Sequence, residues 1–306
     1  MEYIFIGGTP RGFEVIKTLI THGHLPDYAV VLKEDEHETN KASSEITDLL
    51  KENKIKFSLR KKLAEEDKEV ISLKKRDFAI VCGWRTLIDT KLDQYLKYGF
   101  LAAHDSLLPK YRGFAPINWA MICGEQETGV TLFRINEGET DSGPVYAQKK
   151  VSIEANDYAN DVYKKIITAT VDLYLQLIKD LNNGELVFTS QKESEASYTC
   201  KRTPADGRIN WKQSSTEVLN FIRALAPPYP GAFCYLEEQK FIIHRAEKGK
   251  DDKRYVQYIP GRVISIRDGN IEVMCGNGTV IISEWSREAV VSSPAETVRS
   301  ITVTLE

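Results

Sequence analysis

The sequence predicts a doubly wound α/β domain followed by a smaller all-β domain. In the first 200 residues, short apolar runs alternate with segments of helical apolar spacing, and the runs are apolar on both faces. Strands of that kind belong to a parallel sheet that helices cover on both sides. Toward the C-terminus, short β-branched runs are separated by Asp268-Gly269 and Asn277-Gly278. Both dipeptides are strong hairpin signals.

The elements of the α/β domain follow from this alternation. Strands are expected over residues 2–6, 28–32, 55–59 and 78–82. Helices are expected after Gly12, around residues 46–50 and over residues 157–182, with Gly184 as the stop signal of the last one. In a doubly wound sheet, ligand sites lie at the carboxyl ends of the strands. The strand ends are therefore the places to search for chemistry.

The C-terminal part of the chain has a different pattern. A helix is expected over residues 215–225, and strands over residues 241–244, 261–267, 270–274 and 279–282. We therefore expect an α/β domain over residues 1–200, a linker with a helix over 201–234, and a small β barrel or sandwich over 235–306.

Composition excludes several classes of protein. The 306 residues have a formal net charge of −3, so a chain-wide basic surface for nucleic acid is absent. No apolar run approaches the ~18 residues of a membrane span, and the N-terminus opens directly into a strand-like segment without a signal-peptide pattern. Five cysteines without a Cys-x-x-Cys pair are typical of reduced thiols. These observations predict a cytoplasmic protein that does not contact membranes.

The glycine-rich stretch Gly7-Gly8-Thr9-Pro10-Arg11-Gly12 lies where phosphate-binding loops occur, between a strand and a helix. Its spacing matches neither G-x-G-x-x-G nor the Walker pattern. Pro10 fits the first turn of a helix. We interpret the stretch as a tight turn near the site, with a dinucleotide cradle as the alternative.

His104 stands at the end of the apolar run 100–103 and is followed by Asp105. This position is the carboxyl end of an expected strand, where a ligand crevice forms. Position alone leaves two readings open, a packed core histidine or a catalytic one.

The residues around His104 resemble a known family. His104 to Gly113 reads His-Asp-Ser-Leu-Leu-Pro-Lys-Tyr-Arg-Gly and resembles the signature of folate-dependent formyltransferases. Further segments match in order, at residues 82–85, 115–119, 127–131, 141–143, 205–211 and 222–233. The family includes methionyl-tRNA formyltransferase, glycinamide ribonucleotide transformylase and the sugar N-formyltransferases. Residues 110–113 and 226–233 look most like the nucleotide-sugar branch, within it the enzymes for 4-amino-4,6-dideoxy sugars of the pseudaminic acid group.

This resemblance implies a fold, a reaction and a catalytic pair. The fold is a Rossmann-like, doubly wound, mostly parallel sheet with a C-terminal β-barrel of OB-like type. The reaction transfers a formyl group from 10-formyltetrahydrofolate to the amine of a nucleotide-linked amino-deoxy sugar, without a metal. His104 would act as general base and oxyanion stabiliser, and Asp141 would orient it. Taken alone, Asp141 is better interpreted as the start of an Asx turn, and its pairing with His104 favours the catalytic role.

The resemblance also implies binding residues. Cofactor contacts are expected from two loops, at Trp84, Arg85, Thr86, Leu87, Ile88, Thr140 and Ser142. Acceptor contacts are expected at Ser106, Lys110, Arg112 and Tyr229, because Arg and Lys suit phosphate and an aromatic ring stacks on a base. The long helix and the β domain leave room for a homodimer interface.

Two departures from the family pattern stand beside the catalytic pair. Ala102 occupies the place where the family has an oxyanion-binding Asn, and an alanine side chain donates no hydrogen bond. Protonated His104, a backbone N–H or a water would then substitute, unless the chain is an inactive variant. Asp141 also lies one residue farther from His104 than in the family, with the extra residue in 136–140.

Three alternatives to a sugar formyltransferase remain. A methionyl-tRNA formyltransferase would use the same chemistry but would need a basic surface, against which the net charge of −3 argues. A folate-binding protein of the same fold without activity is supported by Ala102. A hydride-transferring enzyme is disfavoured because G-x-G-x-x-G is absent.

Overall fold

The computed structural model describes residues 1–35, 41–137, 140–250 and 255–306, and these form two compact units. The first contains Met1–Gly113, Thr128–Ser152 and Lys164–Thr199. The second contains Phe114–Glu127, Ile153–Tyr163 and Cys200–Glu306. In the described parts of the chain, no helix is both long and apolar enough to span a membrane.

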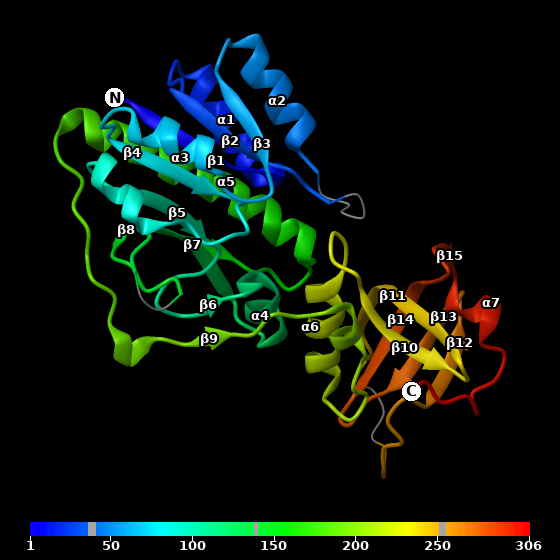
Figure 1. Ribbon diagram of the computed structural model, residues 1–306. Coiled ribbons are helices and arrows are strands. Elements are labelled where there is room, and N and C mark those ends of the chain that lie inside the picture. Colours follow the sequence, from blue (N-terminus) through cyan, green and yellow to red (C-terminus); the bar gives the residue numbers. More distant parts are fainter. Residues whose placement is uncertain (36–40, 138–139, 251–254) are drawn as a thin grey trace. The chain divides into compact units, whose positions relative to one another are not determined.

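A seven-stranded mixed sheet forms the centre of the first unit, with the order β3-β2-β1-β4-β5-β7-β8 (Figure 1). The strands are β1 (Tyr3–Gly7), β2 (Tyr28–Leu32), β3 (Phe57–Arg60), β4 (Phe78–Cys82), β5 (Phe100–His104), β7 (Glu127–Arg134) and β8 (Val145–Ser152). The first five are parallel, whereas β7 pairs with β5 in the antiparallel direction. Strands β2 and β3 follow β1 on one side, and β4 and β5 lie on its other side. This change in the direction of strand order is the topology of a doubly wound sheet.

Helices cover both faces of this sheet. They are α1 (Thr9–Thr21), α2 (Ser43–Glu52), α3 (Glu65–Ser72), a short 3-10 helix η1 (Thr90–Tyr95) and α5 (Ala159–Asn183). Every residue of β1 and of β4 is buried, which a strand achieves only when both of its faces are packed. Ile71 of α3 and Leu92 of η1 join the apolar cluster on one face. From α5, Tyr174 donates its hydroxyl to the carbonyl of Leu101 at 3.2 Å.

The turn between β1 and α1 is pinned to the end of β4. Gly8 donates its N–H to the carbonyl of Cys82 at 3.1 Å. A Cβ at Gly7 would lie 2.2 Å from the same carbonyl, and one at Gly8 would lie 2.5 Å from the Cβ of Leu32. Glycine is therefore required by this close approach. The packing accounts for both glycines as parts of a tight turn.

The second unit is built on an antiparallel sheet with the order β10-β11-β14-β13-β12, and β15 pairs with β14. The strands are β10 (Ala232–Leu236), β11 (Gln239–Lys248), β12 (Val263–Arg267), β13 (Asn270–Met274), β14 (Thr279–Arg287) and β15 (Val290–Ser292). The helices are α4 (Pro116–Ile122), α6 (Ser215–Leu225) and α7 (Pro294–Thr297). Short elements complete the chain, with β6 (Arg112–Gly113) paired to β9 (Tyr198–Thr199) in the first unit and 3-10 turns at Glu193–Glu195 and Pro204–Gly207.

Both predicted hairpins are confirmed. Asp268 and Gly269 both have positive φ and join β12 to β13, and Gly278 has φ +73° in the turn from β13 to β14. Positive φ at both Asp268 and Gly269 is what a type I′ turn requires, whereas the connection from β13 to β14 is a four-residue loop in which Asn277 does not have positive φ. The core beneath the sheet holds Trp285, stacked on Phe241 with ring centroids 4.2 Å apart.

The structure differs from the sequence expectation at several elements. Helix α3 was not expected, because its six leading residues are mostly charged and its apolar positions are few. Strand β8 has no clear alternation because most of its residues are exposed or half-buried. The described strands of the second unit form an open sheet rather than a closed barrel. The last residues of the chain form backbone hydrogen bonds to both edge strands of that sheet. Val303 bonds to Val263 of β12, and Glu306 bonds to Tyr235 of β10.

Candidate functional site

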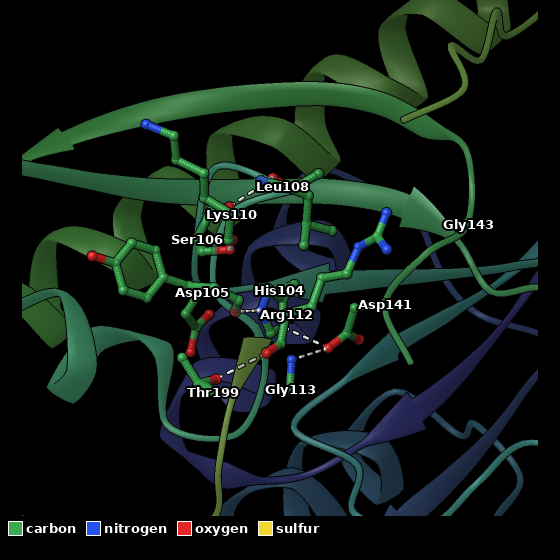
Figure 2. Close-up of polar contacts among 12 residues, drawn as sticks. His104, Asp105, Ser106, Leu108, Lys110, Arg112, Gly113, Asp141, Gly143 and Thr199 are labelled. Carbon is green, nitrogen blue, oxygen red and sulfur yellow. Dashed lines mark hydrogen bonds and ion pairs between the residues drawn. The ribbon is translucent and has the colours of Figure 1, made fainter. Parts of the chain in front are cut away.

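His104 lies at the carboxyl end of β5, and 9% of its surface is exposed. Its two ring nitrogens both face oxygen atoms. Nε2 is 2.8 Å from the backbone carbonyl of Tyr111, and Nδ1 is 3.5 Å from Oδ2 of Asp141 (Figure 2). A neutral imidazole has one N–H donor and one lone pair. The neutral ring can therefore donate a hydrogen bond to only one of the two oxygens.

The electrostatic surroundings of His104 favour the neutral ring. Burial lowers its pKa below the usual value, and the Arg11 cation lowers it further. The Asp141 carboxylate and the hydrogen bond to Tyr111 raise it, but they do not cancel the effect of burial. A neutral imidazole at physiological pH is the form that accepts a proton.

Asp141 is held by the loop that follows His104. Its Oδ2 accepts a hydrogen bond from the backbone N–H of Gly113 at 2.8 Å. The residue itself is left-handed, with φ +56°, a conformation that Asp tolerates better than most residues. The same carboxylate oxygen therefore faces both Gly113 and the imidazole of His104 (Figure 2).

Ala102 precedes His104 by two residues on β5, so both side chains leave the strand on the same face. Ala102 is 9% exposed and packs in the apolar cluster with Val81 and Phe133. Its methyl group donates no hydrogen bond to the site.

The expected cofactor residues after β4 form an exposed loop. Leu87 is 96% exposed, Arg85 and Thr86 are exposed, and Ile88 packs against the apolar cluster. Trp84 packs there too, and its indole Nε1 is buried without a hydrogen-bond partner among the described residues.

The second expected cofactor loop connects β7 to β8. Thr140 is exposed, and the hydroxyl of Ser142 lies 3.4 Å from Oδ1 of Asn136. Part of the stretch 136–140, where the extra residue was expected, lies outside the described residues. A cavity of about 310 Å³ opens at this loop, and its walls are Thr90, Asp93, Arg134, Ile135, Asn136, Glu137 and Pro144.

The four expected acceptor residues have very different surroundings. Lys110 is exposed. Ser106 is 1% exposed and donates its hydroxyl to the carbonyl of Lys110 at 2.6 Å. Arg112 is fully buried and forms two hydrogen bonds to the Glu193 carboxylate, at 2.8 and 2.7 Å. Tyr229 belongs to the second unit, in the turn after α6. Ser106 and Arg112 thus stabilise the loop itself, and their roles toward an acceptor stay predictions.

The structure adds residues that the sequence did not single out for the site. Arg11 forms an ion pair with Asp105, directly after His104. Gln191 contacts the loop of Asp141. Arg11 was visible in the glycine-rich stretch, whereas an isolated Gln far along the chain carried no signal. The described residues contain no group of three or more His, Cys, Asp or Glu that could hold a metal.

Comparison with known families matches residues 3–178 to the formyl transferase model and residues 201–298 to the formyl transferase C-terminal domain. The chain belongs to the formyl transferase family. The first match contains both His104 and Asp141, and the second begins at the end of the first compact unit.

Solved formyl transferase structures share this fold. An N-formyltransferase from Helicobacter canadensis, in complex with folinic acid and dTDP-3-aminofucose, is 20% identical with a TM-score of 0.72, over 93% of this chain and 99% of that one. Methionyl-tRNA formyltransferase from Clostridium thermocellum is 16% identical with a TM-score of 0.57, over 90% of this chain and 100% of that one.

A third similar structure belongs to a much longer protein. HypX from Aquifex aeolicus, in complex with tetrahydrofolic acid, is 18% identical with a TM-score of 0.63. The match covers 97% of this chain and 46% of HypX, so this chain spans about half the length of HypX.

Proposed function

We propose that the chain transfers a formyl group from 10-formyltetrahydrofolate to the amine of a nucleotide-linked amino-deoxy sugar. The observation that carries this proposal is the placement of His104, Asp141 and the Gly113 N–H at the carboxyl end of β5, in a chain of the formyl transferase family. An imidazole with a carboxylate beside it is the arrangement that removes a proton from an attacking amine.

His104 acts as the general base. In its neutral form one ring nitrogen has its lone pair toward an oxygen, either of Tyr111 or of Asp141. The contact between that lone pair and the oxygen is repulsive. An acceptor amine that donates a hydrogen bond to the lone pair would replace this repulsion with an attractive contact. The lowered pKa of His104 keeps this lone pair available at neutral pH.

Asp141 orients the ring and stabilises the imidazolium that forms when His104 takes the proton. Its Oδ2 accepts a hydrogen bond from the Gly113 N–H, which holds the carboxylate beside the ring. The two N–H groups of the imidazolium face Tyr111 and Asp141, and in this proposal its positive charge stabilises the negative charge that develops on the formyl oxygen. This role substitutes for the donor that Ala102 lacks.

The folate co-substrate supplies the formyl group when bound. The residues present fit a flat heterocycle on one side, because Leu87 exposes an apolar side chain and Trp84 has an unpartnered buried indole N–H. We assign the cofactor to the loop of Trp84, Arg85, Thr86, Leu87 and Ile88, with Thr140 and Ser142 opposite. The relatives bound to folinic acid and to tetrahydrofolic acid support a folate co-substrate.

A nucleotide-linked sugar is proposed over tRNA as the acceptor. The relative with dTDP-3-aminofucose has the higher TM-score, 0.72 against 0.57 for the tRNA enzyme. The net charge of −3 argues the same way. In this proposal the exposed Lys110 meets the acceptor phosphates.

The test is to incubate the protein with 10-formyltetrahydrofolate and dTDP-linked sugars that have an amine at C3 or at C4. Initiator methionyl-tRNA is a parallel acceptor, and product masses are read in each case. Formylation of a sugar, lost in the His104→Gln variant, supports the proposal. Formylation of the tRNA alone overturns it. Binding of folate without transfer to any acceptor favours a silent binding protein instead.

A further inference from the structure

Residues 179–200 lie between the two family matches, yet they contact the site. Ser197 accepts the N–H of Arg112 through its carbonyl at 2.8 Å, and its hydroxyl accepts the N–H of Tyr111 at 2.9 Å. Thr199 donates its hydroxyl to the carbonyl of Arg112 at 2.9 Å (Figure 2). This segment therefore binds the loop that runs from His104 to Gly113.

Gln191 is the residue of this segment that also reaches Asp141. Its Nε2 donates to the backbone carbonyls of Asp141 and of Gly143, both at 2.7 Å. Its Oε1 accepts from Nε of Arg112 at 3.1 Å and from Nη2 at 2.8 Å. Both N–H donors and the oxygen of this one amide are thus occupied. The amide joins the loop of His104 to the loop of Asp141.

Arg112 gives Gln191 a rigid support. Its guanidinium is fully buried and forms paired hydrogen bonds with Glu193, a geometry that fixes the plane of the guanidinium. Tyr198 accepts a further hydrogen bond at 3.0 Å. A side chain anchored in this way transmits little motion to the amide that it contacts.

We propose that Gln191 is a positioning residue that sets the place of Asp141 relative to His104. Asp141 is left-handed and is held at two points, its carbonyl on Gln191 and its carboxylate on Gly113. Gln191 is hydrogen-bonded to Arg112, and Gly113 is the next residue along the chain. The carboxylate of Asp141 and the imidazole of His104 are therefore held by the same loop. The catalytic part of this inference rests on the proposed function, because it assumes that Asp141 serves His104 in the reaction.

Two substitutions separate this role from simple support of Arg112. Gln191→Glu keeps oxygen acceptors for Arg112 but removes both N–H donors and places negative charge beside two carbonyl oxygens. Gln191→Leu removes all four hydrogen bonds. If Gln191 acts through Asp141, both variants misplace the carboxylate. If it only supports Arg112, Gln191→Glu behaves as the wild type.

The first readout needs no substrate. The Gly113 amide reports the contact with Asp141, because its N–H donates to that carboxylate. We expect hydrogen exchange at Gly113 to accelerate at least tenfold in both variants, with unchanged exchange at β1 amides. Lys192→Gln, at the exposed neighbour, is the matched control and keeps the wild-type rate. Wild-type exchange at Gly113 in Gln191→Glu overturns the proposal.

The second readout is kinetic and uses the acceptor found for the wild type. Displacement of the carboxylate by about 1 Å lowers the rate on the order of a hundredfold. We expect kcat to fall by that amount in both variants, while KM for the folate stays within threefold. Equal kcat in Gln191→Glu and wild type overturns the catalytic part. If no acceptor is formylated by the wild type, the proposed function fails, while exchange at Gly113 still decides the positioning role.

Discussion

Arg11 forms an ion pair with Asp105, the residue that follows His104. Both side chains are largely buried, with exposed fractions of 11% and 18%. A charge in such a place is weakly screened and acts on its neighbours more strongly than a surface charge. The Arg11 cation accordingly lowers the pKa of His104, in the same direction as burial does. The pair connects the first turn of α1 to the residue that follows the proposed base at the end of β5.

Replacing Arg11 by Gln is expected to raise the pKa of His104. The change removes a cation that disfavours the imidazolium and leaves the Asp105 carboxylate, which favours it. The protonated ring then persists to higher pH, and the acid limb of the kcat/KM profile moves upward in pH. An NMR titration of the His104 ring measures the shift without substrate. Lys17→Gln removes an exposed charge from the same helix and is expected to leave the titration unchanged. A downward shift in Arg11→Gln contradicts this prediction.

Substitution of the proposed catalytic pair is expected to separate their roles. His104→Gln removes the proton acceptor, so kcat should fall by about 10²–10⁴-fold, the usual size of a general-base contribution. Asp141→Asn keeps an acceptor oxygen for the Gly113 N–H but removes the charge that raises the pKa of His104. That pKa should therefore fall while kcat decreases. Single-turnover formylation and the His104 titration measure the two effects, and an unchanged kcat in His104→Gln excludes the assigned role.

The alternation of apolar runs and helices was enough to predict the doubly wound sheet. Strands 28–32 and 78–82 and the helix over 215–225 were placed at the bounds that the structure shows. These elements have strong periodic patterns and clear end signals, such as the capping box that begins at Ser214. Helix α3 and strand β8 have weak apolar patterns, so their existence depends on tertiary packing that a local pattern does not encode.

The candidate site was predicted in part, and for a comparable reason. His104 and Asp141 were found through the family resemblance, and the structure brings them within 3.5 Å. Gln191 lies 50 residues from the carbonyl of Asp141 that it binds, and no local pattern marks such a contact. The burial of Arg112 was also hidden, because its partner Glu193 lies 81 residues away along the chain. The boundaries at 200 and 234 stay predictions.

Ala102→Asn is expected to destabilise the protein without improving catalysis. Ala102 packs against Val81 and Phe133 in an apolar cluster, and burying an amide there without partners costs about 1–3 kcal/mol. If protonated His104 supplies the missing donor, kcat/KM should stay within tenfold of the wild type or fall. Thermal unfolding and steady-state formylation measure the two quantities. A rise in kcat/KM of a hundredfold or more would show that the absent donor limits the reaction.

Gly83 is the first residue after β4, at the start of the proposed cofactor loop. Gly83→Ala is expected to destabilise the first unit. Gly83 has φ +70°, and a Cβ there would lie 2.3 Å from the carbonyl oxygen of Gly8. The variant combines left-handed backbone strain with a backbone clash that a side-chain rotation cannot relieve.

Gly23→Ala isolates the first of these two effects. Gly23 has φ +80°, and no atom lies within 4 Å of its added Cβ. We expect this control to lose about 1–2 kcal/mol, the cost of a non-glycine residue in the left-handed region. Gly83→Ala should lose more than Gly23→Ala in urea unfolding, and it should also weaken folate binding, because the clash moves β4's end away from the β1–α1 turn. Equal losses in the two variants would show that this turn can separate from β4 at no cost, contrary to the contact between Gly8 and Cys82.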